Sequence, residues 1–145
     1  MNEFELLPGE GATGIRFGDD RADVRREFGA DPESAKRTPD SVTQYDYYCE
    51  LNFFVYYDAD YLVEAVEFAQ GASLNYSGMN ILEASATVLR QFLQKKMIPF
   101  VETPDSLLAE SLSLCAWYPD KEDEPQRGPA SVLVFRKGYH DQRQA

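Results

Sequence analysis

The side chains that most often carry catalysis or bind metals are scarce in this sequence. It has one histidine, His140, and two cysteines, Cys49 and Cys115, that lie far apart. A tetrahedral zinc site needs three or four such ligands, so these residues predict no bound metal. A Cys-His nucleophile would require His140 to fold back onto one cysteine. No nucleophile elbow, P-loop or EF-hand spacing occurs, and we expect no cofactor.

One glycine-rich segment, from Gly9 to Gly14, satisfies the letter of the dinucleotide-binding fingerprint G-x-G-x-x-G. That fingerprint needs a buried strand before it and a helix that opens at its glycines, so that the helix N-terminus holds a pyrophosphate. Here the preceding segment is short and acidic, and the predicted helix begins several residues too late. We interpret the segment as a flexible turn.

Carboxylates are abundant, so an enzyme that uses two of them as acid and base stays open as an alternative. Most of them nevertheless have structural explanations. Helix capping, a turn and a solvated loop account for three groups: Asp19, Asp20 and Asp23; Asp58 and Asp60; Glu122, Asp123 and Glu124.

Composition narrows the class of protein. The chain has 145 residues, 43% of them hydrophobic and 13% aromatic, which fits one globular domain. Its formal net charge of -11 repels nucleic acid and anionic membranes and attracts basic partners. No apolar run approaches the ~20 residues of a membrane-spanning helix. The N-terminal residues lack a signal-peptide pattern, so we expect a cytoplasmic protein.

The chain order predicts a helix followed by strands, twice. Asp20 and Ser85 are plausible N-caps for the two helices. Gly29 and Pro99 mark where they end. Alternating Tyr, Phe and Val predict the strands. The expected strands are Val42–Tyr48, Leu51–Tyr57, Tyr61–Phe68, Phe100–Glu102, Leu112–Tyr118 and Ser131–Arg136.

The two halves resemble each other. Gly78-Met79-Asn80-Ile81 repeats the pattern of Gly14-Ile15-Arg16-Phe17, 64 residues later. We therefore predict an α+β fold in which residues 1–145 form a single domain of two pseudo-repeats, about 14–71 and 78–138. Each unit would be a helix plus an antiparallel sheet, and together they would form one continuous sheet with the helices on one face. Chance similarity of the halves is the alternative.

Period-2 alternation predicts which side chains lie on the opposite face of that sheet. If Phe53 and Val55 face the helices, large aromatic side chains point the other way, where nothing in the chain is left to cover them. Tyr and Trp on an open face are typical binding anchors. A covering loop and a homodimer are the alternatives. The candidate interface residues on this face are Asn52, Phe54, Tyr56, Ser113 and Trp117.

Four short motifs carry a resemblance to a known group of proteins. Two lie in the first helix and the last strand: Asp23-Val24-x-x-x-Phe28-Gly29 and Val134-Phe135-Arg136-Lys137-Gly138-Tyr139. The others are Val55-Tyr56-Tyr57-Asp58 and Ala65-Val66-Glu67-Phe68. With them the chain resembles an uncharacterised family of small bacterial cytoplasmic proteins similar to toxin-associated immunity proteins. More loosely, it is similar to the duplicated fold of β-lactamase inhibitor proteins. The resemblance implies protein binding and carries no catalytic residue.

Together these observations predict a non-enzymatic protein-binding module, in its sharpest form an immunity protein that neutralises a basic toxin domain. The open aromatic face would bind, and the acidic loop at Glu122, Asp123 and Glu124 would steer the partner as a rim. We expect no nucleic acid and no membrane as partners. A homo-oligomeric adaptor or a small-ligand-binding protein is the first alternative, and the carboxylate-dependent enzyme is the second.

Overall fold

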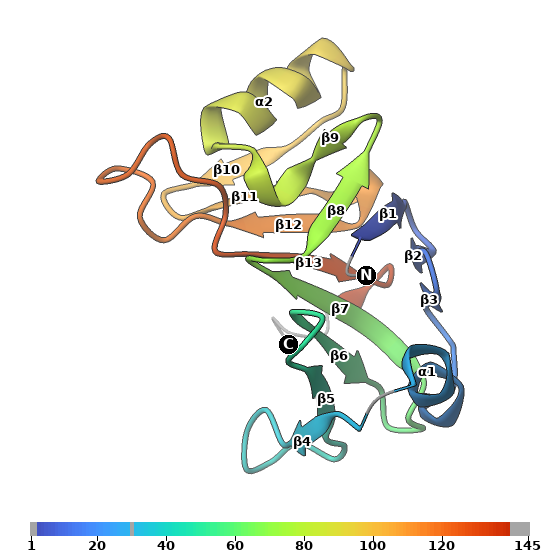
Figure 1. Cartoon of the computed structure of the whole chain (residues 1–145). Helices are drawn as coiled ribbons and strands as arrows, with labels where there is room; N and C mark the ends of the chain where they lie inside the picture. The colour runs from blue at the N-terminus through green and yellow to red at the C-terminus, as the bar shows by residue number, and fades with distance from the viewer. Residues whose placement is uncertain (1–2, 30, 140–145) are drawn as a thin grey trace.

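Two helices and two sheets make up the part of the chain that the computed structural model describes, residues 3–29 and 31–139 (Figure 1). The predicted α+β class is confirmed, since both sheets are built almost entirely from antiparallel pairs. Of the predicted strands, Phe100–Glu102 is shifted by one residue, and Tyr61–Phe68 begins two residues later and ends one residue later, at Ala69. The others are present with trimmed ends.

The larger sheet has eight strands, all antiparallel to their neighbours, in the order β10-β11-β12-β13-β7-β6-β5-β4. Four strands from the first half of the chain therefore join four from the second half at the β7–β13 pair. The strands are β4 Glu33–Ala35, β5 Tyr45–Tyr48, β6 Phe53–Tyr57, β7 Val63–Ala69, β10 Val101–Thr103, β11 Ser106–Ala109, β12 Leu114–Trp117 and β13 Ser131–Phe135.

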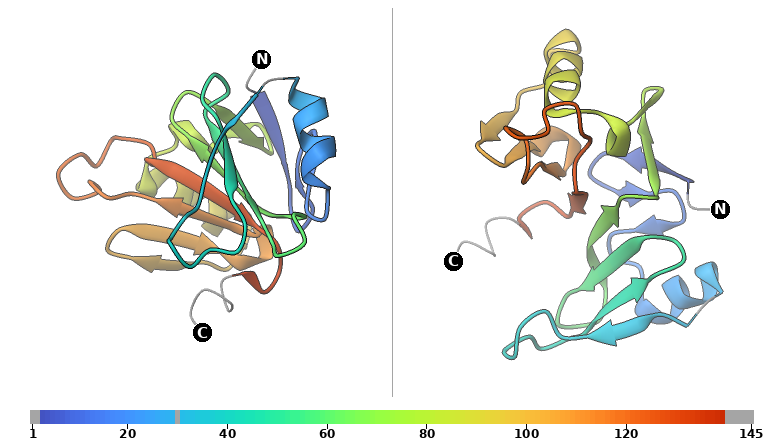
Figure 2. Two further views of the ribbon diagram at one scale, coloured as in Figure 1. Left: turned by 90° about the horizontal axis from the view of Figure 1, so that it is seen from below. Right: turned by 60° about the vertical axis from the view of Figure 1, so that its left-hand side comes forward.

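A second sheet, of five strands, forms a layer that the sequence did not predict. Its order is β3-β2-β1-β8-β9, and β1 runs parallel to β8. The segment interpreted above as a flexible turn supplies its strand β2. In Figure 2 the β1–β3 segment and α1 lie side by side along one flank of the molecule. The strands are β1 Glu3–Leu7, β2 Gly11–Ala12, β3 Ile15–Arg16, β8 Ser73–Tyr76 and β9 Met79–Asn80.

Both helices have the predicted caps. The Asp20 side chain accepts a hydrogen bond from the Ala22 N–H at the start of α1 (Arg21–Phe28), and Gly29 ends it in the left-handed conformation. Ser85 caps α2 (Ala86–Lys95) in the same way. Two short 3₁₀ helices, η1 (Ile81–Glu83) and η2 (Glu110–Leu112), complete the elements. No helix among the described residues is long and apolar enough to cross a membrane.

One hydrophobic core spans both halves of the chain. Opposite each other in the central pair, Val66 of β7 and Val134 of β13 are fully buried on the same face. Val24 of α1 and Leu89 of α2 belong to the same core, so both helices cover this inner face of the eight-stranded sheet. Phe4 of β1 packs there too, which places the five-stranded sheet on that side.

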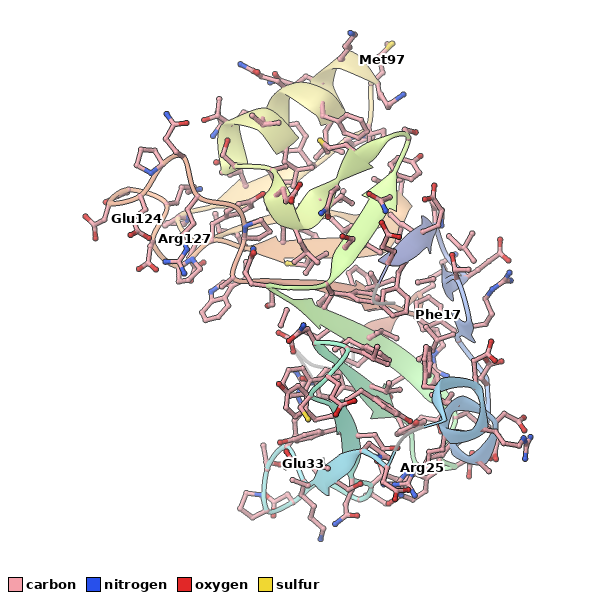
Figure 3. The ribbon with its side chains drawn as sticks, viewed as in Figure 1. Phe17, Arg25, Glu33, Met97, Glu124 and Arg127 are labelled. Atoms are coloured by element: carbon pink, nitrogen blue, oxygen red, sulfur yellow. The ribbon has the colours of Figure 1, made fainter. Side chains whose placement is uncertain are left out.

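The first helix is fixed to the edge strands by a buried carboxylate, Asp46 of β5. Its two oxygens accept hydrogen bonds from the guanidinium groups of Arg21 and Arg25, at 2.7–3.1 Å, and from the Ser34 hydroxyl at 2.7 Å. Figure 3 shows Arg25 on the side of α1 that faces these strands. Burial alone would raise the pKa of Asp46, but its hydrogen bonds to both arginines and Ser34 hold that pKa far below its ordinary value.

We predict that Asp46→Asn lowers the free energy of unfolding at neutral pH by about 3 kcal/mol, because two arginines lose their shared buried partner. A carboxyl with a depressed folded pKa stabilises the fold fully above its unfolded pKa of about 4 and loses that contribution as pH falls further. The variant should therefore show a weaker decline in stability below about pH 4 than the wild type, measured by denaturant unfolding.

Asp23→Asn is the matched control, since Asp23 forms an exposed ion pair with Arg26 on the same helix. It should change stability by less than about 1 kcal/mol. An Asp46→Asn variant that is as stable as this control would contradict the role assigned to the buried carboxylate.

Candidate functional site

On the outer face of the eight-stranded sheet, opposite the helices, one row of side chains crosses every strand. The six inner members of the row are half-buried and the two at the sheet edges are exposed. Only one of the six inner members is charged. In register across the sheet they are Val101, Leu108, Cys115, Leu133, Glu67, Phe54, Tyr47 and Glu33.

Aromatic rings dominate the end of this row that lies on β5 and β6. Tyr47 stacks on Phe54 with ring centroids 4.3 Å apart. Tyr45 meets both Phe54 and Tyr56 edge-on, at 5.8 Å in each case. These geometries are the favourable ones for aromatic pairs, so the rings form a fixed surface.

Glu67 of β7 is the one carboxylate within the row. Its oxygens accept hydrogen bonds from the Tyr56 hydroxyl at 2.6 Å and the Ser131 hydroxyl at 2.7 Å. No basic residue in 3–29 or 31–139 forms an ion pair with it. Burial, together with the neighbouring charge of Glu67, raises the pKa of Tyr56, so the phenol stays a proton donor. Glu67 is held in position by neutral donors and keeps its charge uncompensated.

A loop covers one end of the outer face. In the segment between β4 and β5, the guanidinium of Arg37 lies 4.0 Å from the centre of the Tyr56 ring. The same group hydrogen-bonds the hydroxyl of Tyr139, which is buried near the end of the described chain. Tyr56 is consequently only 9% exposed. The covering loop considered above is thus present over Tyr56.

The other candidate anchors lie outside this covered end. Phe54 is half-buried within the row, and Trp117 on β12 is 47% exposed. Trp117 lies opposite Ser131, the residue that donates to Glu67, so it belongs to the neighbouring row of the same face. The structure thus places Phe54, Tyr56 and Trp117 on the predicted face but leaves only two of them accessible.

Asn52 and Ser113 lie in turns at the sheet ends. Both have left-handed backbone conformations, with φ of 61° and 56°, immediately before β6 and β12. The Asn52 side chain packs against Gly71, and Ser113 is buried. Each carbonyl accepts a hydrogen bond from the neighbouring strand, from Ala69 N–H and Phe135 N–H respectively. These two residues therefore shape the turns that begin β6 and β12. They do not lie at the centre of the outer face.

The acidic residues Glu122, Asp123 and Glu124 are exposed in the long loop between β12 and β13, which extends away from the sheets (Figure 1). Figure 3 shows Glu124 and Arg127 together on this loop, where they form an ion pair at 2.7 Å. Arg127 therefore compensates part of the negative charge of this acidic loop. The loop begins directly after Trp117, so it borders the outer face.

Sequence reasoning missed Glu67, Tyr47 and Leu133. The signal was present for Glu67, because it stands between the two core positions Val66 and Phe68 and must point the opposite way. That these three side chains share a row depends on strand order and register, which no local pattern reveals.

No protein-family model matches the chain, and the comparisons with curated proteins and with solved structures found no match. Among the described residues no cluster of three or more His, Cys, Asp and Glu side chains is placed to hold a metal ion. His140 lies outside the described residues. The function is therefore argued from the outer face and the charge of the chain.

We predict that Tyr56→Phe lowers the free energy of unfolding by about 1.5 kcal/mol, because the half-buried Glu67 loses a hydrogen-bond donor. Tyr47→Phe is the control, since the Tyr47 hydroxyl makes no hydrogen bond with a described residue. Urea unfolding of the two variants measures the difference. Equal stabilities would show that the Tyr56–Glu67 hydrogen bond does not hold the centre of the face together.

Proposed function

We propose that this chain is a non-enzymatic protein-binding module that holds a basic protein against the outer face of its eight-stranded sheet. The observation that carries the proposal is Glu67, a carboxylate without an ion-pair partner among the described residues, which lies near the centre of the row. The other five inner members of the row carry no charge. A lysine or arginine side chain of a partner would supply the missing cation, and the surrounding rings would contact its apolar stem.

The size of the face supports a protein as the occupant. Seven inter-strand spacings of about 4.8 Å make the sheet about 34 Å wide. An interface of ordinary size buries about 800 Å² on each partner, which a patch of this width provides. Phe54 and Trp117 supply the large accessible rings that typically dominate binding energy.

Charge selects the kind of partner. A net charge of -11 accelerates encounter with a basic protein and slows encounter with another acidic one. A second copy of the chain fits the face poorly, because it would bring a second Glu67 and the same net charge. The acidic residues Glu122 and Asp123, which form no ion pair with a described residue, would act as the steering rim beside Trp117.

In its most specific form the proposal is an immunity role in the cytoplasm, with a basic toxin domain as the partner. The sequence resemblance described above supports this form. The inhibitor-like fold analogy supports only protein binding.

We further propose that the fold arose from a tandem duplication of residues 14–71 and 78–138. The two hairpins that precede the helices have matching registers: Gly11↔Arg16 in the first becomes Asn75↔Asn80 in the second, 64 residues on. Gly14 and Gly78 occupy these turns with φ of 85° and 83°. The left-handed turns before β6 and β12, and the mirrored strand order, support the same proposal. A crystal structure in which the two segments superpose poorly would contradict it.

The binding proposal predicts that Trp117→Ala and Phe54→Ala each weaken the complex with the proposed basic toxin domain by about 2 kcal/mol, or about thirtyfold in Kd. Met97→Ala is the control, because Met97 is 89% exposed and lies beyond α2, on the side away from this face (Figure 3). Calorimetric titration gives the affinities, and circular dichroism checks the fold. Wild-type binding by folded Trp117→Ala and Phe54→Ala variants would rule out the outer face.

The steering rim makes a separate kinetic prediction. Neutralising Glu122, Asp123 and Glu124 to the corresponding amides should slow association, leave dissociation nearly unchanged, and lose its effect at high salt. Surface plasmon resonance at low and high salt measures both rates.

The control removes the same number of charges from exposed acids on the inner side of the molecule, namely Glu5, Glu27 and Glu83. An equal slowing by this control would show that net charge alone, and not the position of the acidic loop, sets the association rate.

A further inference from the structure

Beside the covered end of the outer face lies a pocket of about 310 Å³. Its walls come from five parts of the chain: the loop between β4 and β5, the start of β5, the end of β6 with its turn, the start of β7, and the segment after β13. The volume lies at the small end of the range for ligand sites. Tyr45 and Tyr56 provide apolar walls, and Arg37 and Glu64 provide opposite charges.

Glu64 is an incompletely satisfied carboxylate. Its side chain is only 15% exposed, it accepts no hydrogen bond from a described residue, and its nearest cation, Arg136, is 3.8 Å away. Arg136 is engaged more closely by Asp58, at 3.2 Å. Burial raises the pKa of Glu64 above its ordinary value, against the opposing effects of Arg136 and Arg37. A hydrogen-bonding cation in the pocket would satisfy this group.

Arg37 is the complementary case. Its guanidinium stacks over Tyr56 and bonds Tyr139, but it forms no ion pair with a carboxylate among the described residues. It lowers the pKa of Glu64, so its charge is felt there, yet the two groups do not form an ion pair with each other. An unpaired cation and a poorly paired anion thus line one small cavity without neutralising each other.

We propose that this pocket binds a small zwitterion of the α-amino acid class, with its ammonium on Glu64 and its carboxylate on Arg37. Such a ligand supplies both missing partners and leaves the net charge of the pocket unchanged. A simple anion would leave Glu64 unsatisfied, and a simple cation would leave Arg37 unpaired. The tyrosine rings would contact the ligand's side chain. This inference is independent of the protein partner proposed above.

The second carboxylate of the pocket, Asp58, does not make it an acid–base site. One Asp58 oxygen accepts hydrogen bonds from the N–H groups of Asp60 and Leu62, and the other bonds Arg136. The backbone hydrogen bonds and Arg136 lower its pKa against the effect of burial. Asp58 is therefore committed to the turn between β6 and β7, and it holds Arg136 away from closer contact with Glu64.

The experiment is calorimetric titration of the full chain with the standard amino acids, at ligand concentrations up to about 10 mM. For the best binder, the α-amide lacks the carboxylate and the N-acetyl derivative lacks the ammonium. Each derivative should bind about tenfold more weakly or worse. If no amino acid binds, or if either derivative binds as well as its parent, the proposal is wrong.

Variants assign each end of the ligand. Glu64→Gln should weaken the amino acid about tenfold but leave binding of the N-acetyl derivative unchanged, because that derivative has no ammonium to lose. Arg37→Met should likewise weaken the amino acid about tenfold but leave binding of the α-amide unchanged, because the α-amide has no carboxylate to lose. Lys36→Met and Glu50→Gln are controls, since both residues are exposed and do not line the pocket. Variants that stay folded and bind like the controls would overturn the assignment.

Binding should also weaken as pH falls. The ligand's ammonium favours ionised Glu64, whose raised pKa brings its protonation closer to neutral pH than for an ordinary glutamate. The other groups facing it keep their charges: Asp58 because its pKa is lowered, and Arg37 and Arg136 because they are arginines. Titrations from about pH 8 to about pH 5 should show this loss in the wild type and not in Glu64→Gln. Equal pH dependence in the two would contradict the role of Glu64.

Discussion

The antiparallel pairing of β7 with β13 is the constraint on which the rest of the structure depends. It joins the two groups of four strands through five residue pairs, from Ser131↔Ala69 to Phe135↔Ala65. Side chains alternate along a strand, so this register puts Val66 opposite Val134 under the helices and Glu67 opposite Leu133 on the outer face. A slip of one residue would exchange the two faces and drive Glu67 into the core, where an unpaired charge is costly. The core and the candidate interface are therefore set by the same pairing.

Nearly all elements outside the eight-stranded sheet lie on one side of it. Both helices and the five-stranded sheet pack on the inner face, while the loop around Arg37 and the buried Tyr139 cover only one end of the outer face. An antiparallel sheet with one open face usually alternates apolar and polar residues, so that the open face is polar. Here that face carries Phe54, Leu133 and Trp117 instead. This departure from a polar open face supports the protein-binding proposal.

Local chemistry made the helices and the inner face predictable. Asp20 and Ser85 cap their helices because a side-chain oxygen can satisfy a free N–H in any surrounding, and Gly29 adopts a conformation that other residues avoid. The five-stranded sheet was unpredictable because β2, β3 and β9 are two residues long, too short to show a period. The burial of Asp46 was equally unpredictable, since it depends on two arginines that approach from another element. Contacts between residues far apart in the sequence produce no local sequence pattern from which they could be predicted.

Tyr56 shows how closely the candidate interface and the proposed pocket are connected. Its ring lies under Arg37 and lines the pocket, while its hydroxyl holds Glu67 at the centre of the outer face. A ligand that draws Arg37 toward its carboxylate acts on one side of this ring, and a partner's cation at Glu67 acts on the other. If the two bindings interact, thermodynamic linkage requires each to change the affinity of the other by the same factor. Tyr56, which the covering loop removes from the surface, is thus the side chain through which such a coupling would pass.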